Sequence, residues 1–167
     1  GRVTEVERLS FSGNKAFSDR RLRQVLETKQ AGLLRALIKR DTFVPDRLDL
    51  DRQLLTEFYR SRGYIDADVR GVSSEFASDR EGFFISFTVS EGQKYVFDNV
   101  SVVSDYEGVD AAAYQPEIRV RKGATYSPTL IENTIARMEA VGQREGVTFL
   151  RVAPVVAEGP AATAAPL

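Results

Sequence analysis

The chain has 167 residues, of which 43% are hydrophobic and 28% are charged, and its formal net charge is −1. This composition is typical of a globular protein, and the balanced charge argues against a nucleic-acid partner, which would require a basic face. Because the sequence contains no histidine and no cysteine, the commonest metal ligands, general base and thiol nucleophile are missing, and we expect no catalytic residue, cofactor or metal.

The first predicted elements are a strand and a helix. Apolar and polar residues alternate over Val6–Ser12, which predicts a strand, and Gly13 begins the turn that follows. Ser18 is a candidate N-cap for the next helix, because its hydroxyl can accept a hydrogen bond from a free N–H of the first turn. Apolar residues at helical spacing within residues 22–26 give this helix one buried face.

The segment Lys29–Val44 supports two interpretations. Apolar residues pair at helical spacing over Leu33–Ile38, among arginines and a lysine. They could form a short amphipathic helix that contacts a membrane or a partner, or a turn whose leucines pack on their own domain. So short a segment gives little periodicity to judge, and we favour the turn.

A helix, a stop and a strand over residues 45–69 form the clearest unit of the chain. A proline suits the first helical position, and the apolar stripe of the helix includes Phe58. Gly63 follows at a position where helices commonly end in a left-handed residue. The spacing then changes to alternation over residues 65–76, and a shift of apolar parity at Gly71 predicts a strand with a bulge.

The most apolar strand of this half is Phe83–Val89, where phenylalanine, isoleucine and valine alternate with other residues. We therefore place it in the middle of the sheet, with Val6–Ser12 at one edge and residues 65–76 at the other. The first half of the chain thus predicts a β-α-α-β-β module of the α+β class, in which a three-stranded mixed sheet is covered by two helices.

The same unit recurs at an offset of 83 residues. Pro45 recurs as Pro128 and Gly63 as Gly146, and apolar residues stay in phase between them. One such match would arise by chance, but several in phase, including the residues that start and stop a helix, argue for two tandem copies of one small module.

The second copy is predicted to be incomplete. Strands are expected at residues 95–103 and 149–156, with a short helix at 109–115 and the long helix from Pro128 between them. The residues after the second strand are rich in alanine and proline and show no alternation, so no last strand is recognisable. The predicted boundaries are residues 1–91 for the first module, 92–158 for the second and 159–167 for the tail.

Acidic residues crowd the start of the helix after Pro45, at Asp46, Asp49 and Asp51. They could bind a hard cation, but favourable interaction with the positive end of a helix dipole explains them better. Asp66 and Asp68 could form a carboxylate pair, but alternate residues on the solvent-facing side of a strand explain them equally well. No feature of the sequence favours a catalytic site over these explanations.

Three motifs together resemble the POTRA family, the polypeptide-transport-associated modules. They are Leu9-Ser-Phe11-Ser-Gly13-Asn14-Lys-Ala-Phe17, Phe58-Tyr59-Arg-Ser-Arg-Gly63-Tyr64 and Phe87-Thr-Val-Ser-Glu91-Gly92-Gln-Lys-Tyr95. The resemblance covers Val3–Val156 and is stronger in the first copy, whose long segment between the helices is similar to a third POTRA domain of an outer-membrane assembly factor. The second copy would then be the fourth. The residues with expected structural roles are Gly13, Phe58, Gly63, Tyr64 and Gly146.

The resemblance implies a binding module rather than an enzyme. In assembly factors of this family the modules lie in the periplasm, in front of a carboxy-terminal membrane barrel. They contact accessory lipoproteins and help receive unfolded outer-membrane β-barrel proteins. The sequence begins at Gly1 without methionine or a signal peptide, so we expect a piece of a longer protein, with the barrel absent from it. The alternative is a POTRA pair from a two-partner secretion transporter, which binds one dedicated exported protein.

The candidate binding site is the edge strand of the first module. An extended chain can add to such an edge through backbone hydrogen bonds. The charged residues and the predicted bulge are also features that protect an edge from pairing, so both interpretations stay open. The candidate residues are Ala67, Asp68, Val69, Arg70, Gly71, Val72, Ser73 and Ser74.

Overall fold

The structure is a computed structural model that describes residues 6–31, 44–75, 82–147 and 150–159. It divides into two compact units. The first comprises Gly1–Asp98 with Lys122–Pro128, and the second comprises Asn99–Arg121 with Thr129–Leu167. The module boundaries inferred from the sequence stay predictions.

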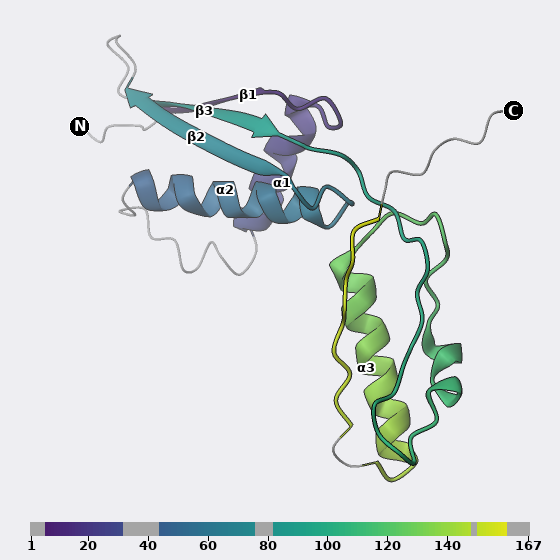
Figure 1. Cartoon of the computed structure of the whole chain (residues 1–167). Helices are drawn as coiled ribbons and strands as arrows, with labels where there is room; N and C mark the ends of the chain where they lie inside the picture. Colours follow the sequence, from purple (N-terminus) through teal and green to yellow (C-terminus); the bar gives the residue numbers. More distant parts are fainter. Residues whose placement is uncertain (1–5, 32–43, 76–81, 148–149, 160–167) are drawn as a thin grey trace, which may run out of the picture. The chain divides into compact units, whose positions relative to one another are not determined.

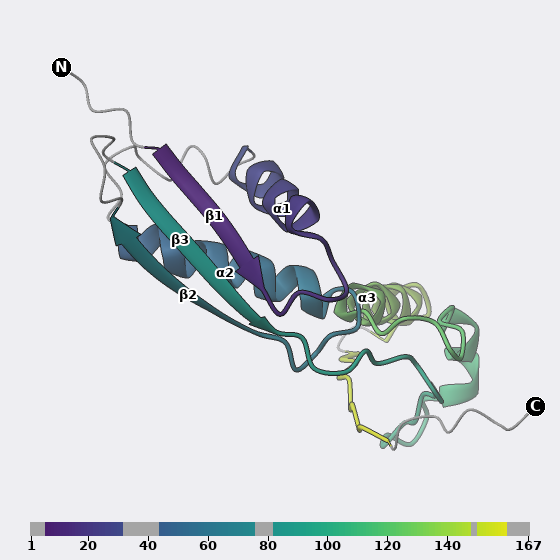
Figure 2. The ribbon, with the colours of Figure 1, turned by 90° about the horizontal axis from the view of Figure 1, so that it is seen from above.

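The first unit contains a mixed three-stranded sheet with two helices on one face (Figure 1). Its elements are β1 (Val6–Ser12), α1 (Asp19–Ala31), α2 (Val44–Arg60), β2 (Asp68–Glu75) and β3 (Gly82–Ser90). The strand order is β1-β3-β2, with β1 parallel and β2 antiparallel to the central β3. The predicted α+β fold and the central place of the most apolar strand are confirmed. Figure 2 shows α2 running beneath the three strands.

A single hydrophobic core lies between the helices and the sheet of this unit. Leu55 and Phe58 of α2 are buried against Ile85 and Phe87 of β3, as the apolar patterns predict. Phe17, in the turn before α1, packs edge-on against Phe58 with ring centroids 4.8 Å apart. The turn after β1, the helix and the central strand are therefore held by one set of apolar contacts.

Helix α2 ends in the glycine motif that the sequence predicts. Gly63 has φ +93°, its N–H donates to the Arg60 carbonyl at 3.3 Å, and the Tyr64 N–H donates to the Tyr59 carbonyl at 3.1 Å. This pair of hydrogen bonds is the Schellman motif, which satisfies carbonyls that the end of a helix leaves free.

Strand β2 is shorter and more regular than the alternation predicts. It begins at Asp68 rather than residue 65, because the preceding residues form a turn in which the Ala67 N–H donates to the Tyr64 carbonyl at 3.3 Å. All eight residues of β2 pair with β3 in continuous register, so the bulge predicted at Gly71 is wrong. The parity shift has another cause, since Val72 is an apolar residue on the outer face and is 68% exposed.

The second unit is built on α3 (Pro128–Arg144) and two single-turn 3₁₀ helices, Ala111–Ala113 and Gln115–Glu117. These short helices replace the single helix predicted at 109–115. The buried core consists of Tyr114, Met138 and Val141, with partly buried residues packed against it. Those residues are Val102, Val109, Ile118, Leu150 and Val152.

Helix α3 ends in the same way as α2. Gly146 has φ +84°, its N–H donates to the Gln143 carbonyl at 3.2 Å, and the Val147 N–H donates to the Gly142 carbonyl at 2.8 Å. Both helices have 17 residues. The internal repeat seen in the sequence is thus visible as two helices of equal length with the same C-terminal motif.

The strands predicted at 95–103 and 149–156 are not formed in the described residues after β3. Only an isolated bridge between Val96 and Thr125 is present there. The strand order of the first unit gives the physical reason, because its first two strands each pair with the third and not with each other. Without a third strand among the described residues, segments in the outer positions have no backbone partner.

The leucine-rich segment Leu33–Ile38, for which two interpretations were open, lies outside the described residues. Within the described parts of the chain, no helix is long and apolar enough to cross a membrane.

Candidate interaction edge

Strand β2 lies at an edge of the sheet in the first unit, since it pairs only with β3. The other edge is β1, whose parallel partner is also β3. An edge strand presents backbone N–H and C=O groups that no neighbouring strand uses. The sequence-predicted candidate residues therefore lie where an added strand could pair, although Ala67 itself precedes the strand.

The side chains of β2 alternate between the core and solvent. Ala67 and Val69 are 4% and 2% exposed and belong to the core beneath the sheet. Asp68, Arg70 and Val72 are exposed on the opposite face. The core-facing residues fix the register of the strand, because a slip by one residue would move their side chains from the core to the solvent-exposed face.

Gly71 lets helix α2 approach the strand closely. A Cβ atom at this position would lie 2.6 Å from Cδ1 of Leu48 and 3.1 Å from Cε1 of Phe87. Since real Cβ atoms do not come so close to carbon atoms, a larger residue would displace Leu48 or the strand. The glycine that the sequence suggested as a bulge is instead a packing site for α2.

One backbone acceptor near the start of β2 is already occupied. Nε of Arg52 in α2 donates to the Val69 carbonyl at 2.9 Å. Arg70 and Asp68 form an exposed ion pair at 3.1 Å, which contributes little to stability. In the described part of the chain, no hydrogen bond from outside the sheet reaches residues 71–73. The accessible part of the edge is therefore its second half.

Arg52 was not singled out from the sequence. The available signal is its position four residues after Leu48, which packs under Gly71. Residues four apart lie on the same helix face, so Arg52 is also directed towards β2.

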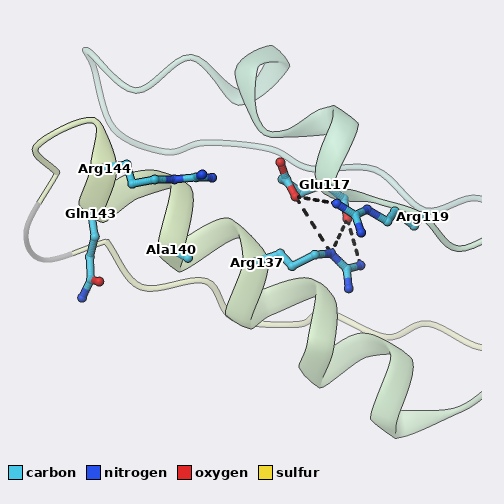
Figure 3. Close-up of a pocket in the computed structure, with 6 residues that line it drawn as sticks. All are labelled: Glu117, Arg119, Arg137, Ala140, Gln143 and Arg144. Carbon is cyan, nitrogen blue, oxygen red and sulfur yellow. Dashed lines mark hydrogen bonds and ion pairs between the residues drawn. The ribbon is translucent and has the colours of Figure 1, made fainter.

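A shallow pocket in the second unit is built mainly from charged residues (Figure 3). Its lining residues are Glu117, Arg119, Arg137, Ala140, Gln143 and Arg144. Nη2 of Arg137 donates to the Glu117 carbonyl at 3.0 Å and to Oγ1 of Thr134 at 3.1 Å, and Arg119 lies 3.8 Å from the Glu117 carboxylate. These bonds tie the short helix at 115–117 to α3, so we assign the pocket a structural role.

Among the residues that the structure describes, no three acidic side chains group as metal ligands would. Asp49 pairs with Arg52 at 3.4 Å, and Asp66 accepts a hydrogen bond from the Tyr95 hydroxyl at 2.8 Å. Both carboxylates are thus engaged with groups of the protein itself.

The model of the POTRA family, described as surface antigen variable number repeat, matches residues 4–92. The chain belongs to the POTRA family. It is 29% identical over 152 residues to the outer membrane protein assembly factor BamA of Neorickettsia risticii (strain Illinois), covering 90% of this chain and 20% of that protein. It is 32% identical over 136 residues to the putative outer membrane protein assembly factor of Treponema pallidum (strain Nichols), covering 79% of this chain and 16% of that protein.

The resemblance to POTRA domains of BamA is thereby confirmed, although the chain spans only a fifth or less of the length of these relatives. Among solved structures, it is similar to the crystal structure of Haemophilus influenzae BamA POTRA3-5, with a TM-score of 0.54 and 19% identity. That match covers 84% of this chain and 51% of the other, and it supports the fold.

The POTRA motifs meet where β3 ends. The Glu91 carboxylate accepts hydrogen bonds from the Tyr59 hydroxyl at 2.8 Å, the Lys15 N–H at 3.0 Å and the Ala16 N–H at 3.0 Å. Burial, followed by the hydrogen bond and the negative charge of Glu91, raises the pKa of Tyr59 well above its ordinary value. A Cβ atom at Gly13 would overlap the Val89 carbonyl. These contacts stabilise the module in which β2 is an edge strand.

Proposed function

We propose that this chain is a periplasmic interaction module of an outer-membrane protein assembly factor, which helps receive and insert unfolded β-barrel proteins by binding them. The observation that carries the proposal is a POTRA module with an accessible strand edge, in a chain whose relatives are named assembly factors. Accessory lipoproteins are further proposed partners. The full-length protein would be anchored in the outer membrane by a carboxy-terminal barrel outside this sequence. The proposed activity is binding, not catalysis.

The proposed mechanism is addition of a client strand to β2. Backbone hydrogen bonds are largely indifferent to side-chain identity, which suits clients that share strand-forming ability but not sequence. Because Arg52 occupies the Val69 carbonyl, we place the pairing at residues 71–74. The exposed Val72 side chain offers an apolar contact on the outer face.

A two-partner secretion transporter is the second candidate. A dedicated partner would need side-chain recognition, whereas the edge offers mainly backbone groups. The relatives' names also favour assembly. Counting POTRA copies in the full-length protein would separate the two functions.

The experiment is an NMR titration of the 167-residue chain with extended peptides from outer-membrane barrel strands. Amide shifts should concentrate in β2 and be largest at residues 71–73. The matched control is the same peptide with alternate amides N-methylated, which keeps the side chains but removes the donors. Equal shifts with the methylated peptide, or shifts at Leu33–Ile38 or in the helices, would rule out edge pairing.

A further inference from the structure

Two arginines converge on one buried aromatic ring in the first unit. Cζ of Arg62, just after α2, lies 4.0 Å from the centroid of the Phe58 ring, and Cζ of Arg21, in the first turn of α1, lies 5.3 Å from it. Phe58 is only 4% exposed, and its ring is held edge-on by Phe17. The ring attracts each cation through its quadrupole, so the guanidinium groups of α1 and of the segment after α2 both lie at this ring.

Neither guanidinium has a carboxylate partner among the described residues. In the described part of the chain, Arg62 donates only to Oγ of Ser61, at 3.2 Å, and the Arg21 side chain makes no hydrogen bond. By contrast, four other arginines each lie within 4 Å of a carboxylate oxygen. They are Arg52, Arg70, Arg119 and Arg137.

The two cations also oppose each other. Partial burial and then the charge of Arg21 lower the pKa of Arg62 from its ordinary value. Like charges held together are unfavourable unless an anion joins them. A guanidinium group offers a planar fork of donors that matches the two oxygens of a carboxylate.

We propose that Arg21 and Arg62 form a binding site for a carboxylate group of a partner protein. The acidic residues Asp19 and Glu57 lie close in sequence to the pair, and they would repel an extended anionic surface more than a single carboxylate. This favours an acidic side chain over a lipid surface. The inference rests on the proposed function in that the partner is a protein, but it uses no part of β2.

The test follows the Nε–H signals of the arginines by NMR while a hexaglutamate peptide is added to the 167-residue chain. Saturable shifts are expected at Arg21 and Arg62. Arg20 and Arg60 are the matched controls, since Arg20 is next to Arg21 in α1 and Arg60 is the last residue of α2, two residues before Arg62. Both are exposed and contact neither a ring nor a carboxylate in the described part of the chain.

Substitution sharpens this test. Arg21→Gln should weaken peptide binding about tenfold, the effect of losing one charge-assisted hydrogen bond, while Arg20→Gln should leave it nearly unchanged. Arg62→Lys keeps the charge but removes the fork and should also weaken binding. Thermal melting verifies that each variant is folded, and since Arg21 is exposed, its substitution should change stability little.

Three results would overturn the proposal. Equal weakening by Arg20→Gln would indicate general charge attraction, and unsaturable shifts would show that no site exists. Binding to phosphatidylglycerol vesicles that depends on Arg21, without peptide binding, would assign the pair to a membrane. Barrel-strand peptides should still shift the β2 amides of Arg21→Gln, so failure here is distinguishable from failure of edge pairing.

Discussion

At the residue scale, Phe58 has two sets of neighbours. Its side chain belongs to the hydrophobic core of the first unit, and the guanidinium groups of Arg21 and Arg62 lie over its ring. Phe58→Ala should therefore lower the free energy of unfolding by about 3–5 kcal/mol, the range for buried aromatics. A urea titration measures this, and a loss below about 1 kcal/mol would contradict the packing described.

Gly63 combines a left-handed backbone with a crowded surrounding. A Cβ atom there would lie 2.8 Å from the Tyr95 carbonyl oxygen, whereas one at Gly146, with a similar φ in the same motif, would have no atom of the described residues within 4 Å. Gly146→Ala should thus lose about 1–2 kcal/mol from backbone strain alone, and Gly63→Ala should lose more. Gly63→Val should be worse still. Equal losses at the two glycines, measured by chemical denaturation, would show that the Tyr95 contact is unimportant.

Tyr59 should make stability depend on pH in the alkaline range. Its pKa is raised in the folded state, so the fold favours the neutral phenol. That stabilisation is fully present below the ordinary tyrosine pKa of about 10, and it is lost as the pH rises towards the folded-state pKa. Tyr59→Phe should be less stable than the parent below this range, and the difference should shrink above it. A difference that stays constant up to high pH would contradict the assigned hydrogen bond to Glu91.

At the element scale, Arg52 limits the accessible part of β2. Arg52→Met keeps the aliphatic packing but releases the Val69 carbonyl, so a barrel-strand peptide should bind about fivefold more tightly, as expected for one added hydrogen bond. Its amide shifts should also extend towards Asp68. Arg60→Met is the control, because Arg60 is exposed on the same helix. Tighter binding by both variants would indicate a charge effect instead.

The sequence predicted elements well where local chemistry decides them. The glycine stop at Gly63 and the central strand Phe83–Val89 follow from backbone freedom and apolar content, and both are present. It failed where tertiary contacts decide. Gly71 is explained by Leu48 of another element, and the edge protection by Arg52 needs α2 to lie beneath β2. Neither contact is visible in the order of residues along one strand.

At the scale of the whole molecule, the chain divides into two compact units whose long helices end in the same motif. Only the first has a complete three-stranded sheet among the described residues. The predicted edge-strand binding therefore belongs to the first unit. In the second, the arginines of the pocket are largely engaged with Glu117 and Thr134.

The most direct test of strand addition is hydrogen–deuterium exchange of the chain, alone and with an unfolded outer-membrane β-barrel protein held soluble in urea at a concentration that leaves the chain folded. Pairing at β2 should slow exchange of those amides at residues 71–74 that face away from β3, since these are the ones an added strand would engage, and leave β1 unchanged. Protection that appears instead in β1 or on the helices, or no protection at saturating client, would contradict the account.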